Sequence, residues 1–199
     1  MGRARIGRRS VSRLPEAFRL AEEEHDPIGC LQAAGAACIA VFHAAEEFER
    51  LDAWFDATAP LLESGMRPAL TGLTALLVYS GAMIALMRRP AHPLARRCES
   101  ELMTLMTEPI DVNQRISGAA AFMLYLCYTG DIHAARRLEA TIEPLLQVPE
   151  LTPLNRAFWY ADLGYASVVE NTPARGHAAL VQAEAIGERE GFGFVLTVS

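Results

Sequence analysis

The chain has 199 residues, of which 51% are apolar, and a formal net charge of −6. It is long enough for one domain of ordinary size or two small ones, with a substantial hydrophobic core. The acidic balance argues against direct nucleic-acid binding, because such surfaces are normally basic. All 18 basic residues are Arg, and the lack of Lys excludes a Walker A phosphate loop and a Schiff-base lysine.

The first thirteen residues carry five Arg and no acidic residue. No apolar stretch follows them, as a secretory signal would require. We therefore expect residues 1–13 to form a flexible Arg-rich arm, followed by a helical domain over residues 14–199.

Helix-capping signals divide the rest of the chain. Asp26-Pro27, Thr152-Pro153 and Thr172-Pro173 each pair an N-cap residue with Pro at the first helical position, and Asp111 offers a further cap. Ala and Leu dominate, and no alternation of period two is long enough for a sheet. The pattern predicts helices near 15–25, 28–45, 47–63, 68–88, 92–107, 112–129, 131–147, 153–169 and 173–190.

These helices alternate between two kinds. The segments 28–45, 68–87, 112–129 and 153–169 carry few or no charges, whereas those between and after them are charged and amphipathic. At an offset of 40 residues, Arg96, Arg97 and Glu99 coincide with Arg136, Arg137 and Glu139. A recurrence of 40–45 residues is typical of two-helix solenoid repeats.

The sequence therefore predicts an all-α fold, a right-handed superhelix of paired antiparallel helices with a period of about 42 residues. The uncharged helices would form the inner layer. The final GFGFVLTVS reads as the start of another uncharged helix, so we expect the last repeat to be incomplete and the chain to be part of a longer protein.

This alternation, with the Gly130-Asp131 opening G-D-x-x-x-A and paired amphipathic helices, resembles tetratricopeptide-like superhelical domains. It resembles more closely the helical repeat region of MalT/LuxR-type bacterial transcription regulators, over residues 14–199. The resemblance implies a curved scaffold that binds partner proteins or an inducer, flanked in full-length members by an NTPase module and an output domain. The period departs from the 34-residue tetratricopeptide repeat, so no family residue carries over.

Two sets of residues are candidates for partner binding. The pairs Arg96-Arg97 and Arg136-Arg137 could form a repeated basic ridge for an acidic peptide or phosphate; the alternative, which we favour, is a solvated face with each Arg paired to a nearby Glu. Aromatic residues could anchor a bound segment or, as we favour, pack in the core. They are Trp54, Trp159 and Tyr160.

Asp131 and His133 raise the question of a chemical site. Residues two apart on a helix do not face each other, and no further ligand recurs at metal-binding spacing nearby. Gly130 ending one helix and Asp131 capping the next explains the motif better. We therefore expect neither a metal site nor a cofactor.

The four cysteines form no C-x-x-C pair and each lies in an apolar run. They read as small core residues of a protein in a reducing compartment, which favours the cytoplasm.

The function that the sequence favours is a non-enzymatic scaffold for a protein partner or small effector, within a transcription or signalling regulator; homo-oligomerisation stays open. The alternatives are an all-α enzyme or small-molecule-binding protein using His92, His133 or His177, and a membrane protein. The uncharged run of residues 69–87 has the length of a membrane span, but burial in a helical array explains all four uncharged helices together.

Overall fold

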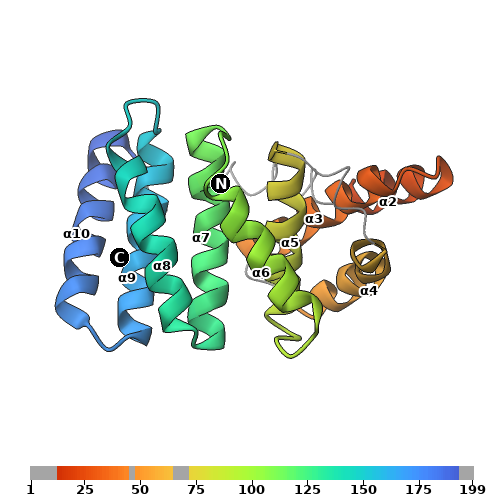
Figure 1. The fold of residues 1–199 in the computed structure, drawn as a ribbon. Helices are drawn as coiled ribbons and strands as arrows, with labels where there is room; N and C mark the ends of the chain where they lie inside the picture. Colours follow the sequence, from red (N-terminus) through yellow and green to blue (C-terminus); the bar gives the residue numbers. More distant parts are fainter. Residues whose placement is uncertain (1–12, 45–47, 65–71, 193–199) are drawn as a thin grey trace. The chain divides into compact units, whose positions relative to one another are not determined.

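The computed structural model describes residues 13–44, 48–64 and 72–192, and within these ranges it contains helices and no strands. The all-α prediction is confirmed at this level. The ends of the predicted segments near 45, 47 and 68–71, the arm at 1–12 and the terminal residues 193–199 lie outside the described residues. In chain order the helices are α2 (Leu14–Glu23), α3 (Pro27–Ala44), α4 (Arg50–Glu63), α5 (Gly72–Leu86), α6 (Leu94–Leu105), α7 (Val112–Thr129), α8 (Ile132–Ile142), the 3₁₀ helix η2 (Glu143–Gln147), α9 (Pro153–Val169) and α10 (Pro173–Glu190) (Figure 1).

Most of the predicted caps are present. Asp111 accepts hydrogen bonds from the backbone N–H groups of Asn113 and Gln114, at 3.0 and 3.1 Å, and Asp26 does the same at the start of α3. Thr152 accepts one long bond, 3.4 Å, from the N–H of Asn155. Thr172 is the exception, because its hydroxyl donates to the carbonyl of Ser167 at the end of α9 and makes no cap bond to α10.

The predicted helix over 131–147 is wrong in its last turn. The α-helix ends at Ile142, and Glu143–Gln147 continue as η2. Pro144 has no backbone N–H, so it cannot donate the bond that an α-helix needs there.

The chain divides into two compact units, Met1–Glu101 and Leu102–Ser199, with the boundary inside α6. In the first unit, α3 packs against α2, α4 and α5. Every residue of α5 from Val78 to Leu86 is buried, as expected for a helix that is apolar on all sides.

The crossing of α3 and α5 depends on two glycines. A Cβ atom built on Gly81 would lie 2.4 Å from the Cα of Gly35, and one on Gly35 would lie 2.8 Å from the carbonyl oxygen of Leu77. The two backbones are therefore in direct contact, which only residues without a side chain allow.

In the second unit, α7 packs against α8 and α9, and α9 packs against α10 (Figure 1). Polar contacts join the N-terminal ends of α7 and α9: the Asn113 side chain bonds the backbone of Glu150 and Thr152, at 3.0 and 2.7 Å, and the Ser117 hydroxyl bonds Asn155 at 3.1 Å. Helices α7 and α9 therefore run parallel, with a register of about 40 residues.

Candidate functional site

An apolar strip lies exposed along α7 and α9. On each helix one set of accessible positions recurs every three or four residues, as one face of a helix requires. They are Gln114, Ser117, Ala121, Leu124 and Tyr128 on α7, and Leu154, Phe158, Ala161, Tyr165 and Val168 on α9.

The two faces belong to one surface because α7 and α9 are parallel and corresponding positions lie 40 or 41 residues apart. Tyr128, Tyr165 and Val168 are 61%, 49% and 70% exposed. We call Leu124, Tyr128, Leu154, Phe158, Tyr165 and Val168 the exposed strip. Single exposed apolar residues are ordinary, but a contiguous apolar surface marks an interaction site.

Asp162 lies on the side of α9 that faces α7. Asn155, seven residues earlier and therefore on the same side of α9, bonds to Asn113 and Ser117 of α7. The Asp162 side chain is only partly accessible, and desolvation raises the pKa of its carboxyl to about 8.

A cluster of four charges joins α8, α9 and α10. Glu170, at the C-terminal end of α9, has a side chain only 4% exposed, and its Oε2 lies 2.5 Å from Arg136 Nη2 and 2.8 Å from Arg175 Nη1. Arg136 and Arg175 also form ion pairs with Glu139. Glu170 lies at the C-terminus of α9 and Arg175 in the first turn of α10, where each charge interacts unfavourably with its helix dipole. The ion pair between them offsets this unfavourable interaction.

The predicted Arg residues have different environments. Arg136 is held in this cluster, whereas Arg137 beside it is exposed. Arg96 is exposed and Arg97 half-buried on α6. Arg96 and Arg97 belong to the first unit and Arg136 and Arg137 to the second, so a shared basic ridge stays a prediction.

The three predicted aromatic anchors are also dissimilar. Trp159 is fully buried, so it packs in the core and does not offer the surface position that an anchor needs. Tyr160 is partly buried against Ala157, Ala183 and Ile186. Trp54 is partly accessible and makes an edge-to-face contact with Phe18, with ring centroids 5.7 Å apart.

Asp131 and His133 form a helix junction. Gly130 adopts the left-handed conformation with φ of 78°, and Asp131 accepts a 2.9 Å hydrogen bond from the N–H of Ala134. His133 and His177 are exposed near the starts of α8 and α10. His92 accepts a bond from the N–H of Leu94 and packs edge-on against Phe55.

A second charged cluster ties α4 to the residues that follow α5. Arg88 donates to Asp52 at 2.8 and 3.0 Å, and Arg89 bonds Asp56 while its guanidinium lies 5.2 Å from the centre of the Phe55 ring. The hydrogen bond from Arg88, with the nearby charges of Arg88 and Arg89, lowers the pKa of Asp52. These contacts hold α4 against the segment that follows α5, at the protein surface.

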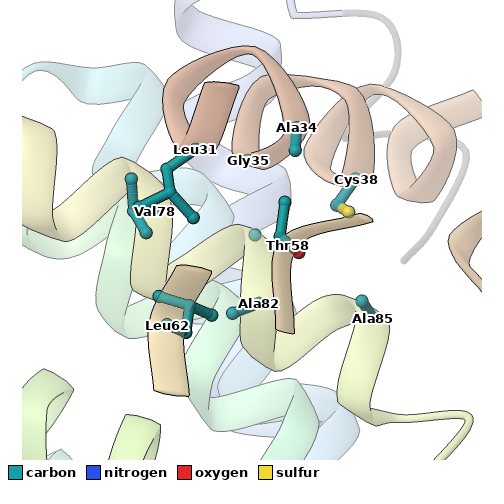
Figure 2. A pocket seen from close by; sticks show the side chains of 10 residues that line it. Leu31, Ala34, Gly35, Cys38, Thr58, Leu62, Val78, Ala82 and Ala85 are labelled. Atoms are coloured by element: carbon teal, nitrogen blue, oxygen red, sulfur yellow. The ribbon is translucent and has the colours of Figure 1, made fainter. Parts of the chain in front are cut away.

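Figure 2 shows a cavity in the first unit, between α3, α4 and α5. The residues that line it include Leu31 and Cys38 from α3, Thr58 and Leu62 from α4, and Val78 from α5. Its volume of about 10 Å³ is that of a single water molecule at most, so it is a packing gap beside the Gly35–Gly81 crossing.

All four cysteines are buried free thiols. Burial raises the pKa of Cys38 and Cys98 to about 12 and that of Cys127 to about 11. A thiol with so high a pKa is a poor nucleophile at neutral pH.

Within the described ranges, no three His, Cys, Asp or Glu side chains are grouped so that they could hold a metal ion. In the same part of the chain, none of the helices combines the length and hydrophobicity needed to cross a bilayer. No protein-family model, curated protein or solved structure matches the chain.

Sequence reasoning missed the exposed strip. The available signal was the spacing of about 40 residues between Leu124 and Tyr165 and between Tyr128 and Val168. The uncharged helices were expected to be buried on most sides, so their apolar residues were assigned to the core together.

Proposed function

We propose that this chain is a non-enzymatic helical scaffold that binds a protein partner through the exposed strip. The observation that carries the proposal is the strip itself, since six apolar or aromatic side chains on two parallel helices share one accessible surface. Aromatic residues on such a surface supply large contact areas at low entropic cost.

The second unit also supports a repeat architecture. Helices α7 and α9 pack in register at about 40 residues, and each is followed by a charged helix that packs against it. We propose that α7–α8 and α9–α10 are successive repeats of a solenoid, in which the uncharged helices carry the binding face. The assignment to a cytoplasmic transcription or signalling regulator rests on the sequence resemblance and on the buried free thiols.

Site-specific photocrosslinking in the cells that express the protein tests the proposal. A benzophenone amino acid replaces Tyr165 in the strip or Val181, which is 42% exposed on α10 outside it. We expect a discrete covalent adduct with another protein from position 165 and none from position 181.

A matched pair of variants serves as the control. Val168→Glu should abolish the adduct formed at position 165, whereas Val181→Glu should leave it unchanged. Adducts that are absent, or equal at both positions, would show that the strip is not the binding surface.

A further inference from the structure

We propose that the partner segment on the exposed strip is an amphipathic helix whose apolar side carries one Lys or Arg, and that this cation pairs with Asp162. The inference rests on the proposed function and names the chemistry of the partner. It follows from the position of Asp162, from its lack of a partner and from the dimensions of the strip.

Asp162 lies between two of the apolar side chains that a partner would cover. Phe158 lies one turn before it and Tyr165 one turn after it on the same side of α9. The face of α9 that bonds to α7 includes Asn155, two turns earlier, so Asp162 lies near the middle of the surface that α7 and α9 share.

Asp162 forms no hydrogen bond or ion pair within the described part of the chain. Desolvation raises the pKa of its carboxyl to about 8. At neutral pH this carboxyl is therefore mostly protonated in the free protein, and a partner's cation at the same place would favour the ionised form and pair with it. A second apolar helix without a cation would instead bury the carboxylate further.

The strip has the length of a short helix. Leu154 to Val168 spans fourteen steps along α9, which is about 21 Å at 1.5 Å per residue. A partner helix of about 14 residues, with apolar residues at spacings of three and four, matches it. Because a single acid, Asp162, lies among these apolar residues, one cation on an otherwise apolar face of the partner is sufficient to pair with it. A dense basic cluster on the partner would leave most of its charges unpaired.

A displayed peptide library provides the probe. The peptides are 16-residue helices with Leu and Phe at spacings of three and four, and one central apolar-face position is randomised to all amino acids. We expect selection on the wild-type protein to enrich Lys and Arg at that position at least tenfold over Met and Gln. The enrichment should disappear on Asp162→Asn, which keeps the side-chain shape.

Affinity measurements on one selected peptide complete the test. Replacing its Arg by Gln should weaken binding to the wild-type protein about tenfold and leave binding to Asp162→Asn unchanged. Glu139→Gln, an acid of α8 outside the strip, serves as the control and should bind the Arg peptide as the wild type does.

The outcomes separate the two proposals. Peptides that bind through the strip, as shown by loss on Tyr165→Arg, but without a preference for Lys or Arg would overturn this inference and leave the proposed function standing. Binding that survives Tyr165→Arg would overturn both. Selected peptides with several basic residues and no apolar stripe would overturn the amphipathic partner.

Discussion

Two acids, Asp162 within α9 and Glu170 at its C-terminal end, have different electrostatic environments. Glu170 is almost inaccessible but lies between the guanidinium groups of Arg136 and Arg175. Asp162 is also desolvated but has no such partner in the described residues. Opposite charges stabilise a buried carboxylate, whereas desolvation without such a partner favours the protonated acid.

The environment of Asp162 makes stability depend on pH. Its pKa rises from 3.8 to about 8 on folding, so between these values the folded protein holds a proton that the unfolded chain has released. The free energy of unfolding therefore falls as pH rises from about 4 to 8 and levels off above 8. Asp162→Asn lacks this loss, and we expect its stability relative to wild type to grow over that window by about 2–4 kcal/mol.

Urea denaturation of both proteins at pH 5, 7 and 8.5 measures this difference. A difference that stays constant with pH would show that Asp162 titrates near its ordinary value in the folded protein.

Glu170 should contribute more to stability than an exposed acid does. Glu170→Gln leaves Arg136 and Arg175 without their shared carboxylate, and we expect a loss of about 1–3 kcal/mol in the free energy of unfolding. The matched control is Glu23→Gln, which breaks the exposed i,i+4 pair with Arg19 and should cost less than about 0.5 kcal/mol. Equal losses in urea denaturation would show that the Glu170 cluster is only a surface contact.

At the scale of helices, close backbone approach fixes how the uncharged helices pack. The Gly35–Gly81 contact brings α3 against α5. Helices α9 and α10 approach less closely, since a Cβ on Gly176 would lie 3.2 Å from the carbonyl oxygen of Gly164. Small residues in these Ala- and Gly-rich helices therefore set interhelical distance as well as filling space.

Gly81→Ala tests the α3–α5 crossing. Alanine favours a helix by about 1 kcal/mol over glycine, but its Cβ would lie 2.6 Å from the carbonyl oxygen of Gly35, and backbone atoms cannot move aside as a side chain can. We expect a net destabilisation of about 1–3 kcal/mol.

The control for this substitution is Gly164→Ala. Its Cβ would meet the side chain of Leu180, which lies 2.5 Å away and can change rotamer, so the loss should be clearly smaller. Thermal unfolding of both variants compares them, and an unchanged or raised Tm for Gly81→Ala would show that the crossing is not tight.

Helix positions could be predicted from sequence because the signals are local. Asp26, Asp111 and Asp131 bond to backbone N–H groups two or three residues away, and such contacts follow directly from residue type. The packing could not be predicted in this way. The contact of Gly35 with Gly81, and that of Arg136 with Glu170, join residues more than thirty positions apart, and many glycine and charge pairings fit the same sequence.

The candidate site shows the same limit. Arg136 and Trp159 stand out by residue type, yet one is held in ion pairs and the other is buried. Tyr165, Val168 and Asp162 were ordinary members of a sparsely charged helix until the side of α9 left uncovered by its neighbours was known.

At the scale of the molecule, each of the two units has its own buried core. The first is centred on α3 and α5, and the second on α7 and α9. Regions that share most of their contacts open together, and regions that do not can open separately.

Hydrogen exchange read by mass spectrometry tests this division. Gly81→Ala should speed amide exchange in α3 and α5 and leave α9 and α10 close to wild type. Glu170→Gln should do the reverse. Exchange that rises equally in both units for either variant would show that the chain opens as one cooperative body.

The burial of the four thiols has a practical consequence for such measurements. Cys30, Cys38 and Cys98 lie in the first unit and Cys127 in the second, all under 6% exposed. Because these sulfur atoms are buried, a maleimide added to the folded protein reaches them only when the surrounding helices separate. The thiolate that reacts then forms in the solvent-exposed state. The four native thiols therefore report the opening of each unit, three for the first unit and one for the second. A cysteine introduced on the exposed strip would be the first to react.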